Sequence, residues 1–97
     1  MKFTWDPRKA EGNLRKHGIA FDEAITVFGD PLAFIFDDIA HSEDEHREII
    51  IGFSTLQRLV LVCFVERIED TIRIISARRA TKNEIRDYEK NARHKTS

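Results

Sequence analysis

The chain has little of several residue types that mark particular classes of protein. It contains one cysteine, Cys63, which excludes an internal disulfide and a four-cysteine zinc site. Its four glycines are isolated, which excludes a glycine-rich phosphate-binding loop. No apolar run approaches the roughly 18–20 residues that cross a bilayer. The N-terminal MKFTWDPRK lacks the apolar stretch of a secretory signal, so we expect a soluble cytoplasmic protein without membrane association.

Length and composition favour one small folded domain. With 97 residues the chain is long enough for one domain and too short for two. A hydrophobic content of 41%, including seven Phe, argues against disorder despite a charged fraction of 34%. We expect a single domain over residues 1–97, with a polar tail at 93–97 that frays.

The net charge of −1 hides a segregation of charge along the chain. Residues 19–46 carry eight acidic side chains and no Lys or Arg. Residues 47–97 carry eleven basic side chains against seven acidic ones. One surface would then attract polyanions, and the acidic one would meet a basic partner. The alternative is that the two halves neutralise each other across the fold.

Local signals predict two helices in the N-terminal third. Asp6 is a favoured N-cap, Pro7 suits the first helical position, and Gly18 supplies a left-handed stop. The first helix therefore runs from Pro7 to about His17. A second, short helix is expected over 22–28, before an Asp-Pro pair that ends it.

The rest of the chain changes to strand patterns and ends in one helix. The expected strands cover 32–36, 47–53, 59–65 and 71–78, with a short N-terminal strand at 3–5. Thr81 and Glu84 then fit a capping box, followed by the apolar stripe of Ile85, Tyr88 and Ala92. The pattern predicts an α+β fold: a small antiparallel four-stranded sheet, plus the N-terminal strand, with helices packed on it.

Arginines gather at the ends of the expected strands. The group comprises Arg47, Arg58, Arg67 and Arg78. Guanidinium groups collected at strand ends would make a phosphate cradle, because they donate planar, bidentate hydrogen bonds. The alternative is that each pairs with an acid such as Glu48, Glu66, Asp70 or Glu84. Strict alternation places Arg79 with Ala77 on one face and Arg78 with Ile74 and Ser76 on the other.

Three side chains of the first helix are further candidates. Lys9 and Lys16 are seven residues apart and share a face, where they would follow a phosphate backbone. His17 would transfer a proton, because imidazoles change charge near neutral pH. Without any ligand, Lys16 and His17 would still complement the helix dipole in the last turn.

The acidic loop holds potential metal ligands, but its spacing fits no strong zinc pattern. These ligands are His41, Glu43, Asp44, Glu45 and His46. Loops rich in Asp and Glu are usually just solvated. We therefore expect no metal and no cofactor. Tyr88 would donate a proton or stack on a base, although its helical spacing is more typical of a core residue.

Several segments together resemble the BrnT family of type II toxins. They lie in the family's order over almost the whole chain: 3–10, 13–21, 47–52, 58–60 and 72–81, then Glu84 and Tyr88. The resemblance implies a RelE-like ribonuclease fold and a toxin that cleaves RNA and arrests translation. It also implies a BrnA-like antitoxin that neutralises the toxin and supplies the DNA-reading part of a complex on operator DNA. A homodimer and a 2:2 complex both stay open.

Residue chemistry divides the matching positions into roles. Metal-independent RNA cleavage needs a base, an acid and cations around the developing charge. Arginines supply charge but carry protons poorly, so His17 or Glu84 is expected to transfer protons, with Tyr88 behind them. The expected catalytic group comprises His17, Arg67, Arg78, Glu84 and Tyr88. The expected RNA-binding group comprises Lys9, Lys16, Arg47, Arg58 and Arg79.

Two functions compete at this point. The first is a metal-independent endoribonuclease toxin held by its antitoxin. The second is a non-catalytic interaction module that acts as co-repressor of a DNA-binding antitoxin. Basic side chains converging in one open groove would favour the enzyme, whereas scattered arginines paired with acids would favour the module. A double-stranded nucleic-acid binder is a third interpretation, which the acidic balance of the chain opposes.

Overall fold

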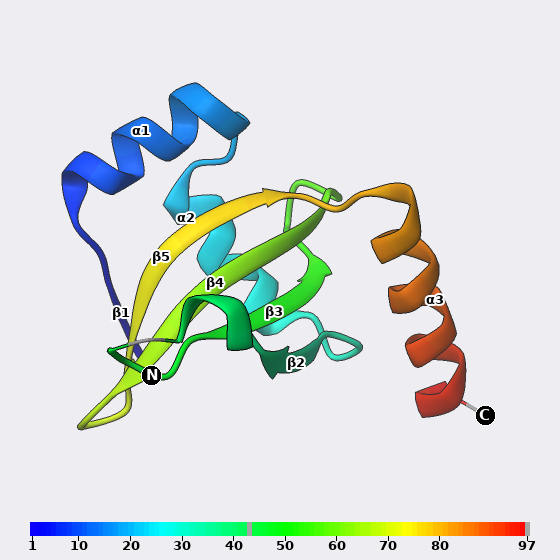
Figure 1. Ribbon diagram of the computed structural model, residues 1–97. Helices are drawn as coiled ribbons and strands as arrows, with labels where there is room; N and C mark the ends of the chain where they lie inside the picture. Colours follow the sequence, from blue (N-terminus) through cyan, green and yellow to red (C-terminus); the bar gives the residue numbers. More distant parts are fainter. Residues whose placement is uncertain (43, 97) are drawn as a thin grey trace.

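Five strands form one sheet in the order β1 (Lys2–Thr4), β5 (Thr71–Arg79), β4 (Leu59–Arg67), β3 (Glu48–Phe53) and β2 (Phe34–Asp37). The computed structural model, which describes residues 1–42 and 44–96, is shown in Figure 1. The four longer strands are antiparallel neighbours, as predicted. The N-terminal strand β1 joins the sheet parallel to β5, so the sheet is mixed.

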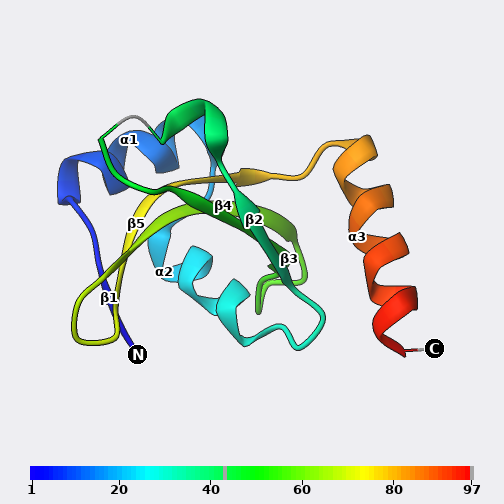
Figure 2. The same cartoon turned by 60° about the horizontal axis from the view of Figure 1, so that its bottom comes forward.

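The helices lie at three places around the sheet. α1 (Pro7–His17) packs along β5, and α2 (Phe21–Ala24) continues into the 3-10 helix η1 (Ile25–Gly29), which packs against β3. α3 (Lys82–Thr96) packs through Tyr88 on the side chains of Ile51 and Leu61, which are separate from the larger core, and Figure 2 shows the helix set apart at one side of the sheet. A 3-10 turn, η2 (Ile39–His41), follows the edge strand β2. The α+β prediction is confirmed, with the expected second helix divided into α2 and η1.

Caps fix α1 where the sequence predicts it. The Asp6 carboxylate accepts a hydrogen bond of 2.8 Å from the Arg8 amide, and Pro7 occupies the first turn. Gly18 adopts the left-handed conformation, with φ 71°, and its amide donates to the Leu14 carbonyl. This conformation costs a glycine little, so the helix ends there and the chain turns toward α2.

The larger core fills the space between the sheet and the N-terminal helices. Phe21 and Val27, from α2 and η1, pack against Val60, Val62 and further inward side chains of β3, β4 and β5. The Phe28 ring lies edge-on to the Phe64 ring, with centroids 5.1 Å apart. This face is therefore closed by well-packed apolar side chains, which supply most of the hydrophobic stabilisation.

An extra residue interrupts the alternation of β5. Cys63 pairs with Ser76, but the next residue of β4, Phe64, pairs with Ile74, which leaves Ile75 without a partner position. Such a bulge shifts the residues beyond it to the opposite face. Ile74 and Ala77 both enter the larger core as a result. The prediction that Ile74 shares a face with Ser76 and Arg78 is therefore wrong.

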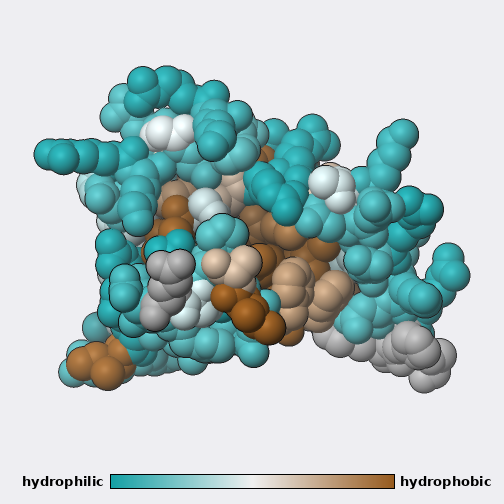
Figure 3. Space-filling model, in the orientation of Figure 1, coloured by the Kyte–Doolittle hydropathy of each residue, from teal (hydrophilic) through white to brown (hydrophobic). Residues whose placement is uncertain are grey.

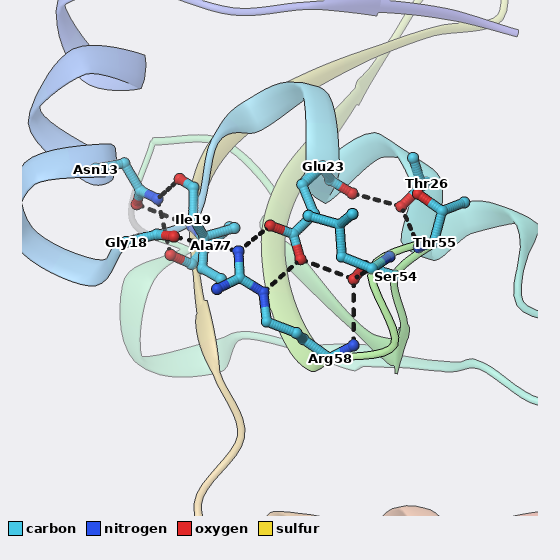
Figure 4. Close-up of polar contacts among 10 residues, drawn as sticks. Asn13, Gly18, Ile19, Glu23, Thr26, Ser54, Thr55, Arg58 and Ala77 are labelled. Atoms are coloured by element: carbon cyan, nitrogen blue, oxygen red, sulfur yellow. Dashed lines mark hydrogen bonds and ion pairs between the residues drawn. The ribbon is translucent and has the colours of Figure 1, made fainter.

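Two buried polar side chains tie the N-terminal helices to the sheet (Figure 4). The Asn13 amide donates to the carbonyls of Ile19 and Ala77 at 2.9 and 2.8 Å, and its oxygen accepts from the Ala77 amide. The Glu23 carboxylate, with its side chain only 5% exposed, accepts from the Ser54 hydroxyl and from Arg58. Asn13 thus fixes the end of α1 beside the end of β5.

A capping box begins α3, as predicted. The Thr81 amide donates to the Glu84 carboxylate at 2.8 Å, and the Glu84 amide donates back to the Thr81 hydroxyl. Farther along the helix, Tyr88 is buried, and its hydroxyl donates to the Asp30 carboxylate at 2.8 Å. The core position of Tyr88 agrees with its helical spacing.

Candidate functional site

One groove gathers most of the cationic and imidazole candidates. It has a volume of about 490 Å³ and lies on the face of the sheet opposite the larger core. We call it the cationic groove; its lining residues are Lys16, His17, Asp38, His41, Arg47, Ile49, Leu61, Cys63, Ser76, Ala77 and Arg78. Five of these side chains are basic or imidazole groups, so the groove suits an anionic ligand.

The end of α1 supplies the first wall of the cationic groove. Lys16 and His17 occupy the last turn, immediately before the Gly18 stop. The Asn13 side chain binds both backbone groups of Ala77, the neighbour of Arg78. The helix end therefore keeps a fixed position relative to the arginine on β5. Local sequence signals place His17 in the turn, and the Asn13 contact places that turn at the groove.

Arg78 reaches the cationic groove because of the bulge in β5. Its two terminal nitrogens donate to the two Glu84 oxygens at 2.8 Å each, in the bidentate geometry that guanidinium favours. The Arg78 hydrogen bonds lower the pKa of Glu84 to about 2. Glu84 is therefore ionised and a very weak base at neutral pH, which suits it to holding Arg78 in place.

A carboxylate–imidazole pair, Asp38 and His41, also lines the cationic groove. His41 is the last residue of η2, and Asp38 directly precedes η2. The Nδ1 atom of His41 lies 3.0 and 3.2 Å from the two carboxylate oxygens of Asp38. Asp38 is 13% exposed, whereas His41 is 69% exposed. The carboxylate thus fixes the ring orientation and leaves the Nε2 atom of His41 toward solvent. Sequence reasoning considered His41 only as a metal ligand and overlooked the pair, whose signal is an acid three residues before a histidine.

The floor of the cationic groove combines a third cation with a thiol. The Arg47 side chain lines the groove, and its Nε atom is buried without a hydrogen-bond partner among residues 1–42 and 44–93. Burial, and then the nearby Asp38 carboxylate, raise the pKa of the Cys63 thiol to about 11. Cys63 therefore stays protonated at neutral pH and is not a nucleophile there.

Several predicted site residues lie away from the cationic groove. Arg58 pairs with Glu23 beneath α2 (Figure 4), and its hydrogen bond is the main cause that lowers the pKa of Glu23. Arg67 lies at the far end of β4 and pairs with Glu45 at 3.0 Å.

The remaining predicted residues are exposed or belong to the core. Lys9 is exposed on α1, and Arg79 is exposed on the β5 face opposite Arg78. The Tyr88 ring stacks on Phe34 and lies edge-on to Phe53, in a second apolar cluster. The structure therefore brings together Lys16, His17, Arg47 and Arg78, with Glu84 behind Arg78.

A separate group could hold a metal ion at the sheet edge. The ligand atoms of Asp37, His46 and Glu48 lie within 4.8 Å of one another, and Asp37 and Glu48 pair across β2 and β3. Burial and the Glu66 carboxylate raise the pKa of Glu48. The ligand set weighed from the sequence differs from this trio, and its member Glu43 lies outside the described residues. The trio does not line the cationic groove.

Comparison with known proteins identifies the family of this fold and groove. Residues 5–84 match the family model described as "Ribonuclease toxin, BrnT, of type II toxin-antitoxin system". The chain belongs to the BrnT family. It is also similar to the 1.1 Å crystal structure of the Brucella abortus ribonuclease toxin BrnT, with 26% sequence identity and a TM-score of 0.66. That match covers 84% of this chain and 99% of the Brucella chain. No curated protein sequence matches significantly.

Membership of the BrnT family makes the chain a ribonuclease toxin of a type II toxin–antitoxin system, with an antitoxin as partner. The cationic groove is consistent with that activity, because each nucleotide of RNA carries a negatively charged phosphate. Within residues 1–42 and 44–96, no helix has the length and apolar character needed to span a membrane.

Proposed function

We propose that this BrnT-family chain cleaves RNA in the cationic groove without a metal ion. The observation that carries the proposal is the placement of two imidazoles, His17 and His41, in one groove with Lys16, Arg47 and Arg78. The two histidines can transfer protons, and the lysine and the two arginines supply positive charge. Together they meet the needs of phosphodiester cleavage by a neighbouring hydroxyl.

The reaction divides between the two histidines. Asp38 holds the Nδ1 proton of His41, so the free Nε2 atom accepts the proton of the ribose 2′-hydroxyl. The 2′-oxygen then forms a bond to the adjacent phosphorus as the bond from phosphorus to the 5′-oxygen breaks. His17, as an imidazolium, gives its proton to the leaving 5′-oxygen. The products are a 2′,3′-cyclic phosphate and a 5′-hydroxyl end.

The cations stabilise the charge that develops on the phosphate. Arg78 is held by Glu84, and its exposed edge faces the groove. Arg47 adds positive charge from the lining of the groove, and Lys16 adds charge from the end of α1. In this proposal Glu84 positions Arg78, and Tyr88 anchors α3, so neither moves a proton.

The non-catalytic module has one supporting observation. Arg58, Arg67 and Arg78 each pair with an acid, as the alternative expects, although two of the three acids differ from those named from the sequence. The convergence of Lys16 and Arg47 with Arg78 favours the enzyme, in agreement with the family description.

The test is RNA cleavage by the purified chain with EDTA present. We expect His41→Ala and His17→Ala each to lower kcat by about 100-fold or more. The matched control is His46→Ala, because His46 is also exposed and lies 3.1 Å from an acid, Asp37, but sits outside the cationic groove. The control should cleave like wild type. Full activity in both groove variants would overturn the proton-transfer roles of the two histidines.

A positioning role for Asp38 has its own readout. Asp38→Asn should lower kcat less than His41→Ala does, and should displace the acid limb of the pH–rate profile. An unchanged profile with a lower kcat would mean that Asp38 only supports the fold. Wild-type chain that cleaves neither naked RNA nor RNA in a translating extract, yet binds antitoxin tightly, would favour the non-catalytic module.

The partner is a BrnA-like antitoxin, and the complex acts in the cytoplasm, where RNA is translated. We expect operator DNA to bind only the toxin–antitoxin complex, with the antitoxin reading the bases. Gel-shift assays on operator DNA with toxin alone, antitoxin alone and both test this expectation. DNA binding by the toxin alone would contradict this expectation. Sedimentation of the complex separates a 1:1 from a 2:2 assembly.

A further inference from the structure

The side chains of Asp37, His46 and Glu48, which we call the edge trio, converge at the β2 edge of the sheet. One ligand atom of each lies within 4.8 Å of the other two. The Nε2 atom of His46 is 3.1 Å from Oδ1 of Asp37. Two ligands bound to a tetrahedral zinc ion at about 2.0–2.1 Å are about 3.4 Å apart, so this pair already has the spacing of two zinc ligands. Side-chain rotation of about 1–2 Å brings the third ligand atom to the same spacing.

Backbone hydrogen bonds fix the edge trio before any ion binds. Asp37 and Glu48 are directly opposite residues of β2 and β3, so their side chains leave the sheet on the same face. Next to them, the Asp38 amide donates to the Arg47 carbonyl at 2.9 Å. This bond closes the base of the loop between the strands and keeps His46 beside Asp37. The ligands are therefore assembled by the strand pairing, which lowers the ordering that binding has to supply.

The edge trio also carries negative charge that no lysine or arginine neutralises within residues 1–42 and 44–93. Like charges directly opposite each other on neighbouring strands destabilise a sheet. Neither Asp37 nor Glu48 forms an ion pair with a lysine or arginine in that part of the chain. Glu66 brings a further carboxylate near Glu48. A divalent cation between the carboxylates would replace this repulsion by attraction, so charge and spacing both favour a bound cation.

The donor atoms select the class of ion. One imidazole with two carboxylates suits zinc and similar divalent transition metals, whereas Mg²⁺ and Ca²⁺ prefer sites made of oxygen alone. The side chains of Asp37 and His46 are 59% and 64% exposed, so an ion reaches them from solvent. In Figure 1 the loop between β2 and β3 lies in front of the sheet, and Figure 3 shows that this face is mostly hydrophilic.

The edge trio lies at the two ends of one loop, residues 38–47. Asp37 directly precedes this loop, and His46 lies near its other end. The same loop carries the Asp38–His41 pair, which lines the cationic groove. Joining the ends of a loop through a metal ion removes conformational freedom from the residues between them. An ion at the edge trio would therefore hold the Asp38–His41 pair more firmly from outside the groove.

We propose that the edge trio binds one zinc-like divalent ion, which stabilises the loop of residues 38–47. Carboxylate oxygens of Asp37 and Glu48 and the Nε2 atom of His46 coordinate the ion, and water fills the remaining position. The ion takes no part in RNA cleavage, because the edge trio does not line the cationic groove. The metal site stands without the catalytic proposal, and only its effect on the Asp38–His41 pair rests on that proposed function.

Titration of the tag-free chain with ZnCl₂ in a calorimeter, after EDTA treatment and dialysis, tests the site. We expect one ion per chain with micromolar affinity, and His46→Ala should weaken binding by about 100-fold or more. The matched control is His41→Ala, which removes an imidazole that also lies 3.0 Å from an aspartate, but outside the edge trio. The control should bind zinc like wild type. Wild-type affinity in His46→Ala would overturn the proposal.

A second variant and a second ion guard against loss of folding and against weak binding to an acidic surface. Glu48→Gln keeps the side-chain shape and removes one charge, so it should fold and bind zinc about 10-fold more weakly. Saturating zinc should raise the melting temperature of wild type and leave that of His46→Ala unchanged. Equal affinity for Mg²⁺ and Zn²⁺, or a zinc dissociation constant above about 1 mM, would overturn the proposal.

The Cys63 thiol, 3.8 Å from the Asp38 carboxylate, is the competing place for a zinc-like ion. Cobalt(II) as the probe separates the two, because a thiolate ligand adds a charge-transfer band that nitrogen and oxygen ligands lack. We expect no such band. Its appearance, together with lost binding in His41→Ala, would place the ion in the cationic groove and overturn the proposal.

Hydrogen exchange tests the effect on the loop. Zinc should slow amide exchange at residues 38–42 and 44–47 in wild type and have no such effect in His46→Ala. Unchanged exchange in zinc-bound wild type would overturn the stabilising role. A chain that binds zinc as described and cleaves no RNA in EDTA would count only against the catalytic proposal. Cleavage that depends on His17 and His41, without zinc binding, would count only against the metal site.

Discussion

Replacing Glu84 by glutamine should destabilise the fold through Arg78 while keeping the capping box, because glutamine also serves at that position. The Arg78 guanidinium is the main cause that holds the pKa of Glu84 at about 2, against an ordinary 4.5. That difference corresponds to at most about 3.4 kcal/mol of folding free energy at neutral pH. Arg78 is 43% exposed, so solvent screening reduces the expected loss to about 1–2 kcal/mol.

The effect should depend on pH in a defined direction. Because the folded pKa of Glu84 lies below the unfolded one, its stabilisation is complete above about pH 4.5 and is lost as the pH falls through about 2. Urea denaturation of wild type and Glu84→Gln measures the difference at pH 7 and again near pH 3, where it should be less than half as large. Glu11→Gln is the control, since Glu11 forms an exposed pair 3.7 Å from Arg15.

Two results would refute this reasoning. The first is a Glu84→Gln variant as stable as wild type at pH 7, which would mean that the pair with Arg78 contributes nothing. The second is a difference that grows toward low pH, which would give the coupling the opposite sign. RNA cleavage by the same variant should fall less than 10-fold and keep its pH profile, because Glu84 is hydrogen-bonded to Arg78 and transfers no proton in the proposed mechanism.

Three further perturbations have defined outcomes. Asn13→Leu removes three buried hydrogen bonds and should lower the free energy of unfolding, measured by urea denaturation, by about 3 kcal/mol. A loss below about 1 kcal/mol would contradict the role of Asn13 in fixing α1. Gly52→Ala places a Cβ atom 2.8 Å from the Ala33 Cβ and should cost about 1–3 kcal/mol, so an unchanged melting temperature would mean that β3 shifts freely there. Alkylation of Cys63 by iodoacetamide should be slow at pH 8 and accelerate toward pH 11, because burial raises the pKa of this thiol to about 11. Rapid labelling of the folded chain at pH 7 would show that the pKa of Cys63 is not raised.

Elements with their own local signals were predictable from the sequence. The bounds of α1 follow from Asp6, Pro7 and Gly18, which act within a few residues of the helix ends. The capping box of Thr81 and Glu84 likewise begins α3. Such signals depend on neighbours in the chain, so they hold wherever the element packs.

Features that depend on pairing across the fold were not predictable in the same way. The bulge at Ile75 exists only because β4 pairs with β5 in a particular register. Arg58 pairs with Glu23, 35 residues away, since α2 packs beside the β3–β4 turn. The Asp38–His41 pair is local, and its spacing was visible, but its place in the cationic groove depends on the path of β2 and β3.

The bulge gives the two consecutive arginines of β5 a redundancy. Side chains on a strand alternate, so only one of Arg78 and Arg79 can point into the cationic groove in any one register. Suppose that the part of β5 after Ile75 slips by one residue, or that one residue is inserted or deleted in that part, while the preceding part of the strand stays in place. Arg79 would then take the place of Arg78 in the groove. The groove would keep an arginine in either register. Strand register thus decides which of the two arginines lines the cationic groove, whereas the tandem pair ensures that one of them does.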